Sequence, residues 1–375
     1  MRPYDVAAYI WPAYHYEPRL EHFWPEKDGE WYTVRRGAPR FPGHDMPKVP
    51  LLGYQDEADP AVMRQHVELA AKHGINVFIM DWYWYENEPC LERQLNDGLI
   101  PALEGTDSRF YLMWANHDVQ CEWDMHRDDF ELLWSGQVDR PTFEHMARRI
   151  IEKYFRLDSY YRIAGAPVFS LYEVSTFIAG LGGLDAARDA LQWFRREVTA
   201  AGHPGLHLQG IMMNGHPLDP ATGAPDPEGM QVREQIVATG LDSVTHYQYC
   251  HITGGQGDYL SWAERATSEW ERHAEEFPLY FPHVSIGWDN TQRFPSQEAI
   301  VIGSCPRYFA RFLQKARAYL DARPEQPPLV TINSWNEWTE GSYLLPDKRW
   351  GYQYLQAVRN VFGDRQAWPG RTQTG

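Results

Sequence analysis

The segment DPAVMRQHVELAAKHGINVFIMDWYWY, residues 59–85, contains the unit from which the fold follows. Asp59 suits the N-cap of a helix, Pro60 stands at the first helical position, and Gly74 closes a stretch with apolar residues at three- and four-residue spacing. The run INVFIMDWYWY (75–85) that follows is almost continuously apolar. Such a run is typical of a strand that is buried on both faces, as parallel sheets require.

The same alternation continues along the whole chain. Apolar runs predict eight strands, at 6–15, 75–85, 110–118, 166–173, 206–214, 241–250, 279–289 and 329–340. Amphipathic stretches between them predict helices, including 59–74, 142–155, 184–202, 259–277 and 306–323. Eight strands that alternate with helices predict a (β/α)8 TIM barrel, an α/β fold. A doubly wound open sheet is the alternative, but no glycine-rich dinucleotide loop follows the first strand.

The chain shows no linker-like or low-complexity stretch, so residues 1–375 are expected to form a single catalytic domain. The connection 16–58 is rich in Pro, Gly, Trp and Arg, and it is too long for a plain loop. We expect it to be an insertion in the first βα loop, over the active-site face of the barrel. Residues 215–227 are expected to form a Pro-rich loop.

Composition limits the classes of ligand. With 51 acidic and 35 basic residues the formal net charge is −16, which repels phosphate backbones and anionic membranes and so argues against nucleic acid and membrane partners. Solubility alone would also explain this acidity. The 16 Trp and 22 Tyr exceed what packing of a core needs. This excess favours flat aromatic platforms for the apolar faces of sugar rings.

Cysteine spacing and the first residues bear on the compartment and on metals. Cys90, Cys121, Cys250 and Cys305 are far apart and form no Cys-x-x-Cys pair, so they are expected to be buried thiols in a reducing compartment. Residues 1–15 hold no long apolar run, so a cytoplasmic location is the default; an export signal ahead of them would imply a periplasmic or secreted protein. The 15 His show no metal-ligand spacing, and we expect neither a metal nor a cofactor.

Polar and aromatic residues gather at all eight expected strand ends, where TIM barrels carry their chemistry. The candidate substrate-binding residues among them are Tyr9, Trp11, Asp81, Trp82, Tyr83, Trp114, Asn116, His117, Tyr172, Glu173, Asn214, His246, Tyr247, Trp288, Asp289, Asn333, Trp335, Asn336, Trp338 and Tyr343. One His or Asn at a strand end normally caps a loop. Eight ends that are alike predict a cup of ring faces, carboxylates and amides for an uncharged, polyhydroxylated carbohydrate ligand.

Glu337 and Glu340 are the candidate catalytic residues. Three aromatic residues flank them and would desolvate their carboxyl groups: Trp335, Trp338 and Tyr343. Desolvation raises the pKa of one carboxylic acid so that it can protonate a leaving oxygen, while a second carboxylate acts as nucleophile or base. The competing explanation is structural: one Glu would cap a helix or pair with Arg349.

Other enzyme classes lack their signatures. The sequence contains no Gly-x-Ser-x-Gly elbow, no P-loop and no His-Glu-x-x-His motif. It also contains no Asp-x-Asp, the metal–nucleotide clamp of many sugar-nucleotide transferases. Glycosidic bond cleavage is therefore the chemistry that the residues favour.

Three stretches carry a resemblance to a known family. RFPGHDMPKVPLLGYQD (40–56), MRQHVELAAKHGINVFIMDWYWY (63–85) and INSWNEWTEGSYLLPDKRWGYQYLQAV (332–358) resemble the WbsX-like family, whose members are often labelled glycosyltransferases because they occur in O-antigen clusters. The barrel of that family is similar to that of glycoside hydrolase family 99, the endo-α-mannosidases and endo-α-mannanases. Family 99 enzymes carry Asn-Glu-Trp-x-Glu at the place where Asn336 to Glu340 stand here.

The resemblance implies a role for each glutamate. Glu337 would deprotonate the 2-hydroxyl of the sugar, which attacks C1 to give a 1,2-anhydro intermediate. Glu340 would protonate the leaving oxygen and then activate water or another acceptor. No metal takes part in this scheme. It requires a 2-hydroxyl trans to the leaving group, as in α-mannosides and α-rhamnosides.

These observations favour a retaining glycoside hydrolase that cleaves an α-linked, mannose- or rhamnose-configured polysaccharide or oligosaccharide. A glycosyltransferase or transglycosylase of surface-polysaccharide (O-antigen) biosynthesis is the alternative. A carbohydrate-binding protein is a third possibility, although it would have little use for two desolvated glutamates in one motif.

Overall fold

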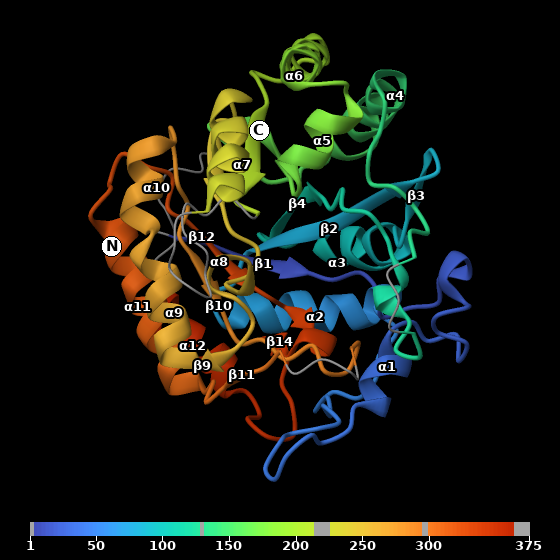
Figure 1. Cartoon of the computed structure of the whole chain (residues 1–375), viewed down its shortest axis with the longest axis vertical. Coiled ribbons are helices and arrows are strands. Elements are labelled where there is room, and N and C mark those ends of the chain that lie inside the picture. The colour runs from blue at the N-terminus through green and yellow to red at the C-terminus, as the bar shows by residue number, and fades with distance from the viewer. Residues whose placement is uncertain (1–3, 128–130, 214–225, 295–298, 364–375) are drawn as a thin grey trace.

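The computed structural model describes residues 4–127, 131–213, 226–294 and 299–363 (Figure 1). Parallel strands form a barrel in the order β10-β12-β1-β2-β4-β6-β7-β8. Their bounds are β1 (Asp5–Ile10), β2 (Val77–Tyr85), β4 (Arg109–Trp114), β6 (Ala166–Leu171), β7 (His207–Ile211), β8 (Ser243–Thr245), β10 (His283–Ser285) and β12 (Leu329–Asn333). A parallel bridge from Val244 to Tyr280 joins β8 to the segment that enters β10. The predicted (β/α)8 TIM barrel is therefore confirmed.

Each barrel strand coincides with one of the predicted apolar runs, although β1 and β4 begin one residue earlier, and most strands are shorter than the run. β1 ends at Ile10, although the run continues to His15, and β12 ends at Asn333 rather than at Glu340. The remaining residues leave the sheet and turn across the mouth of the barrel. The polar ends of the runs therefore belong to loops, where side chains are free to face a ligand.

Helices follow the strands and surround the barrel (Figure 1). They are α2 (Pro60–Lys72), α3 (Ile100–Leu103), α4 (Arg140–Ile150), α5 (Val174–Gly180), α6 (Leu184–Ala200), α7 (Pro227–Ala238), α8 (Cys250–Thr253), α9 (Tyr259–Ser268), α10 (Trp270–Glu276), α11 (Pro306–Asp321) and α12 (Gln353–Phe362). Asp59 caps α2 as predicted, because its carboxylate accepts a hydrogen bond from Ala61 N. None of the helices in the described part of the chain has the length and apolarity needed to span a membrane.

Three of the five predicted helices match the observed bounds to within two residues, and the other two differ more. The stretch 142–155 starts earlier, at Arg140, because Asp139 accepts from Thr142 N and caps the helix there. It ends in a π-helical turn, η4 (Ile151–Phe155). The stretch 259–277 is interrupted at Glu269, which separates α9 from α10.

Short elements complete the described chain. They are η1 (Pro18–Leu20), η2 (Gln94–Leu99), η3 (Cys121–Trp123), η5 (Trp338–Glu340), β3 (Glu88–Cys90), β5 (Arg162–Ile163), β9 (Gly257–Asp258), β11 (Val301–Ile302), β13 (Asn336–Glu337) and β14 (Ser342–Tyr343). Residues 214–225 lie outside the described residues. They include Asn214 and most of the predicted Pro-rich loop 215–227, whose last residue, Pro227, is instead the first residue of α7.

The insertion 16–58 contains α1 (Trp31–Arg36) and contacts the residues that follow β1, β10 and β12. Glu30 N donates to Ala13 O at 2.8 Å, and His44 Nε2 lies 2.8 Å from Asp289 Oδ2. Gly29 (φ +66°) makes this approach possible, since a Cβ there would lie 1.9 Å from Ala13 O. The insertion thus supplies side chains to the same end of the barrel as the strand ends.

Candidate active site

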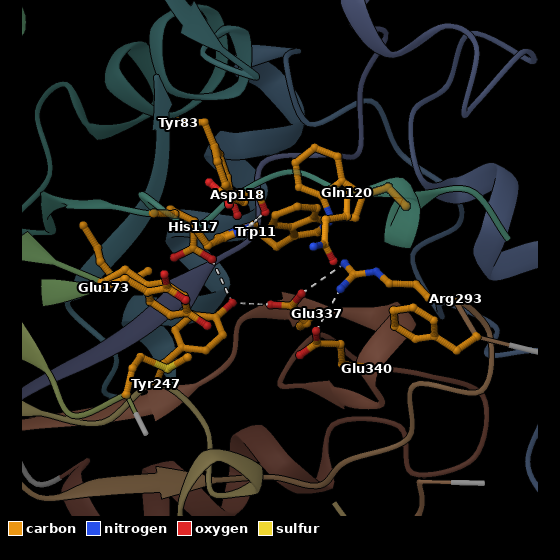
Figure 2. Close-up of a pocket in the computed structure, with 17 residues that line it drawn as sticks. Trp11, Tyr83, His117, Asp118, Gln120, Glu173, Tyr247, Arg293, Glu337 and Glu340 are labelled. Carbon is orange, nitrogen blue, oxygen red and sulfur yellow. Dashed lines mark hydrogen bonds and ion pairs between the residues drawn. The ribbon is translucent and has the colours of Figure 1, made fainter. Parts of the chain in front are cut away.

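A cavity of about 440 Å³ opens among the loops that follow the barrel strands (Figure 2). Nine of the predicted site residues line it: Trp11, Asp81, Tyr83, His117, Tyr172, Glu173, Tyr247, Glu337 and Glu340. They come from β2 and from the segments after β1, β4, β6, β8 and β12. The structure therefore brings together residues that lie more than three hundred positions apart in the sequence.

A small hairpin after β12 places the two glutamates. β13 pairs antiparallel with β14, so that Glu337 is opposite Ser342, and the turn η5 carries Glu340 between them. Gly341 allows the turn: its φ is +63°, and a Cβ there would lie 2.8 Å from Asp289 Cβ. Asp289 N donates to Glu340 O at 2.7 Å and holds the turn in place.

Asn336 fixes the start of this hairpin to the end of β1. Its Oδ1 accepts from Trp11 N at 2.7 Å, and its Nδ2 donates to Trp11 O at 2.8 Å and to Glu57 Oε2 at 2.7 Å. Behind the hairpin the ring of Trp338 stacks on Tyr343, with centroids 3.9 Å apart. These hydrogen bonds and this stacking hold the hairpin in one position, which preorganises Glu337 and Glu340.

Arg293, in the loop after β10, pairs with three carboxylates, those of the buried Glu30 and Glu337 and that of the partly buried Glu340, and Figure 2 shows the last two. Its Nη1 donates to Glu340 Oε1 at 2.8 Å and its Nη2 to Glu337 Oε1 at 3.2 Å. On the other side its Nε donates to Glu30 Oε1 at 2.6 Å. Glu30 also accepts from Trp11 Nε1 at 2.6 Å, so the insertion holds the guanidinium in place. The glutamates pair with Arg293 and not, as the structural alternative proposed, with Arg349.

The two catalytic candidates have different electrostatic environments. Burial raises the pKa of Glu340 well above its usual range, and the charge of Glu337 raises it further. Burial also raises the pKa of Glu337, but Arg293 and a hydrogen bond from Tyr247 oppose this shift. Glu340 Oε2 is buried without a hydrogen-bond partner. The arrangement therefore favours a proton on Glu340 and a charge on Glu337.

Aromatic rings form one wall of the cavity. The indole of Trp11 lies 5.6 Å from the ring of Tyr83 and 5.4 Å from that of Trp123, both in edge contact. The Arg293 guanidinium carbon lies 5.0 Å from the Trp11 ring centroid. Such a wall offers ring faces and few hydrogen-bonding groups, which suits the C–H face of a sugar.

Several predicted residues point away from the cavity because side chains alternate along a strand. Asp81 and Tyr83 face the cavity, whereas Trp82 between them donates from Nε1 to Glu92 Oε1 at 2.9 Å on the helix side. Trp114 packs against Phe143 and Phe177, and the Nδ1 of His246 lies 3.1 Å from the Tyr280 hydroxyl. These three side chains belong to the layer between the barrel and its helices.

Other predicted residues support the loops. Tyr9 donates to His246 O at 2.9 Å, and Asn116 bonds both the N and the O of Glu173 at 2.8 Å. Buried polar contacts also hold Asn333 and Trp335, through Gln248 and His66 respectively. Trp288, Asp289 and Tyr343 line a separate cavity of about 160 Å³ beyond Gly341. Asn214 lies outside the described residues.

Sequence reasoning missed Arg293, Glu30, Trp123 and Gln120. All except Glu30 line the cavity, and Glu30 holds Arg293 from behind. Arg293 could have been found from charge, because two buried glutamates need a cation nearby. The stretch WDNTQRF (288–294) supplies one directly after a predicted strand. In the part of the chain that the structure describes, no group of three or more His, Cys, Asp or Glu is arranged to hold a metal ion.

Comparison with known proteins identifies the family. The model of the family described as Glycosyltransferase WbsX matches residues 6–358, so the chain belongs to this family. The sequence is also similar to the uncharacterized protein WxcX of Xanthomonas campestris pv. campestris, with 28% identity over 367 residues, which is 96% of this chain and 50% of that protein. The chain thus spans about half the length of the curated relatives that it matches.

Solved structures show the same barrel. The family 99 endo-α-mannosidase of Bacteroides thetaiotaomicron, in complex with BIS-TRIS-propane, gives a TM-score of 0.60 at 14% identity and covers 95% of both chains. A glycoside hydrolase-like protein gives a TM-score of 0.60 at 14% identity, with 96% of this chain and 94% of that chain covered. At this identity the likeness concerns the fold, which is that of family 99 glycoside hydrolases.

Proposed function

We propose that this member of the WbsX family is a retaining glycoside hydrolase that acts on α-linked, mannose- or rhamnose-configured saccharides. The observation that carries the proposal is the pair Glu337 and Glu340 in an aromatic-lined cavity, with Arg293 bonded to both. In this proposal the rings of Trp11 and Tyr83 hold the sugar, and the carboxylates and His117 bind its hydroxyl groups.

Glu340 acts as the general acid. Burial raises the pKa of this carboxyl well above its usual range, which favours the protonated form that a general acid needs. Its Oε1 accepts from Arg293, which leaves Oε2 to carry the proton toward the glycosidic oxygen. As the bond from C1 to that oxygen breaks, the proton passes to the leaving group and Glu340 becomes ionised.

Glu337 acts as the base toward the 2-hydroxyl of the same sugar. Arg293 and Tyr247 stabilise its ionised form. As it takes the hydroxyl proton, O2 forms a bond to C1 from the face opposite the leaving group, giving a 1,2-anhydro sugar. A nucleophile within the same ring is already oriented, which avoids the entropic cost of a second reactant.

The second step reverses the roles. Ionised Glu340 takes a proton from water, whose oxygen bonds to C1 while the C1–O2 bond breaks. Glu337 then returns its proton to O2. Two inversions at C1 give net retention, and both carboxyl groups recover their starting states.

The second candidate function is glycosyl transfer, which the description of the family favours. A sugar hydroxyl in place of water would accept the glycosyl group in the second step. A sugar-nucleotide donor fits the cavity poorly. Among the described residues that line the cavity, Arg293 is the one Lys or Arg. Its guanidinium is already paired with three carboxylates. A diphosphate would be desolvated beside Asp81, Asp118 and Glu173, with no cation beyond the already paired Arg293 among the described lining residues.

A substrate panel tests the proposal. α-Mannans, rhamnans and O-polysaccharides are incubated with wild type, Glu337→Gln and Glu340→Ala, and with Glu264→Gln, an exposed residue on α9, as the control. We expect released sugar in the wild type and the control, and a loss of about two orders of magnitude or more in both active-site variants. Turnover that requires a nucleotide sugar would support the transferase instead. Full activity in both variants would place catalysis elsewhere.

A further inference from the structure

Tyr247 lies between two carboxylates that share its hydroxyl group. The Tyr247 hydroxyl oxygen is 2.8 Å from Asp81 Oδ2. It is also 2.6 Å from Glu337 Oε2 (Figure 2). Both distances are those of hydrogen bonds, and each such bond needs its own hydrogen. The hydroxyl supplies one hydrogen and an ionised carboxylate supplies none. One more proton must therefore reside on Asp81 or on Glu337.

We propose that Asp81 holds this proton and donates it to the Tyr247 oxygen, so that Tyr247 donates its own hydrogen to Glu337. The charges around the two carboxyl groups decide which of them carries the proton. Glu337 is in contact with Arg293, at 3.2 Å, which favours its ionised form. No ion pair forms between Asp81 and a Lys or Arg in the described part of the chain, and its Oδ1 is buried without a partner.

The other groups that face Asp81 agree with this assignment. They are Tyr9, Tyr83 and Tyr172, together with Glu340 of the hairpin after β12. Among the described residues, Arg293 is the one cation that acts on Asp81; it lowers the pKa of this carboxyl, but it is the smallest of the causes and its ion pairs are with Glu30, Glu337 and Glu340. Asp81 is 2% exposed, and burial raises its pKa well above the usual range, with the charge of Glu337 as the next cause. A neutral acid is the form that such surroundings stabilise.

The consequence for the reaction rests on the proposed function. Asp81 is a positioning residue that acts through Tyr247. Its proton makes Tyr247 a better donor, because hydrogen bonds in a chain polarise one another. Tyr247 then holds Glu337 ionised and fixes the plane of its carboxylate. If Asp81 were ionised, Tyr247 would have one hydrogen for two anions, and Glu337 would lose its donor for part of the time.

Carbon-13 NMR of protein labelled at the aspartate carboxyl carbon tests the proton directly and needs no substrate. Near neutral pH we expect one aspartate resonance at the position of a protonated carboxyl. It should be lost in Asp81→Asn and kept in Asp189→Asn, a control on the exposed face of α6. An Asp81 resonance at the ionised position would overturn the proposal, whatever the enzyme's activity proves to be.

Glu337→Gln tests the direction of the hydrogen bonds that run from Asp81 through Tyr247 to Glu337. The amide of Gln can donate to the Tyr247 oxygen, so Tyr247 would turn its hydrogen to Asp81. We expect the Asp81 resonance to move to the ionised position. A resonance that stays unchanged would show that Asp81 is protonated for reasons unrelated to Glu337, and would overturn the coupling through Tyr247.

Activity on whichever substrate the panel identifies gives the rescue test. The amide of Asp81→Asn donates to Tyr247 as a protonated acid would, whereas Asp81→Ala removes the donor. We expect Asp81→Ala to lose at least about tenfold in kcat, and Asn to recover most of that loss. Equal losses in both variants, with equal thermal unfolding, would contradict the role of the proton. Because the NMR result stands alone, failure of the proposed function and failure of this inference remain distinguishable.

Discussion

Replacement of Arg293 by Met should show how much of the protein's stability depends on the one cation between these carboxylates. The guanidinium donates to Glu30, Glu337 and Glu340, and the side chain is 6% exposed. Removal of one partner of a buried ion pair typically costs about 3–5 kcal/mol, because a buried charge is left uncompensated. We expect a loss of this size in the free energy of unfolding near pH 8, since Met replaces the packing of the stem but not the charge.

The loss should depend on pH in a fixed direction. Arg293 lowers the pKa of Glu337 and of Glu340, so both carboxyls have higher folded-state pKa values in the variant. A carboxyl with a raised folded pKa contributes stability that is present below its unfolded pKa and is lost as pH rises. The difference between variant and wild type should therefore shrink as pH falls from the folded-state pKa of each carboxyl in the variant toward its folded-state pKa in the wild type, by up to about 1.4 kcal/mol per pH unit for each group that titrates in this range.

Urea denaturation followed by circular dichroism, at several pH values, measures this difference. Arg311→Met is the control, because this arginine is 61% exposed and pairs with a surface glutamate. We expect a change within about 0.5 kcal/mol for the control at every pH. A loss for Arg293→Met that is the same at pH 5 and pH 8 would refute the electrostatic account. Wild-type stability in Arg293→Met would refute it equally.

Three further predictions concern residues around the cavity. Glu57 is fully buried, and burial raises its pKa. Glu57→Gln should therefore become more stable relative to wild type as pH rises above about 4.3. A difference in urea midpoint between variant and wild type that stays constant across pH would contradict this. Asn336→Ala leaves the N–H and C=O of Trp11 without their hydrogen-bond partner and should lower the free energy of unfolding by about 2–4 kcal/mol. A loss below about 1 kcal/mol would show that Asn336 does not hold the hairpin to the end of β1. Trp123→Ala removes part of the aromatic wall and should raise KM by about tenfold with little change in kcat; an unchanged KM would place the sugar elsewhere.

The sequence was sufficient for the barrel because its strands carry a strong local signal. Continuous apolar runs such as 75–85, set between capped amphipathic helices, specify buried parallel strands without any long-range information. Strand ends were harder to predict. The apolar runs pass without a break into the loops, so where the sheet ends depends on tertiary contacts such as the Asn336 bonds to Trp11.

Individual side chains of the site were predicted less well for two physical reasons. Neighbouring residues on a strand face opposite sides, so Asp81 and Trp82 look alike in a list of strand-end residues although one faces the cavity and the other the helices. The second reason is that loops bring groups together across the chain. Arg293 and Glu30 meet at 2.6 Å although 263 positions separate them, and no local pattern marks that contact.

The central claim is that Glu340 supplies the proton and Glu337 the base for cleavage of one glycosidic bond. Fluoride release from α-mannosyl and α-rhamnosyl fluorides tests this division of roles most directly, because fluoride leaves without a proton from the enzyme. For whichever fluoride the wild type cleaves, the account predicts a burst of fluoride in the first turnover of Glu340→Ala, while Glu337→Gln releases none. Loss of the burst in Glu340→Ala, or its persistence in Glu337→Gln, would contradict the account.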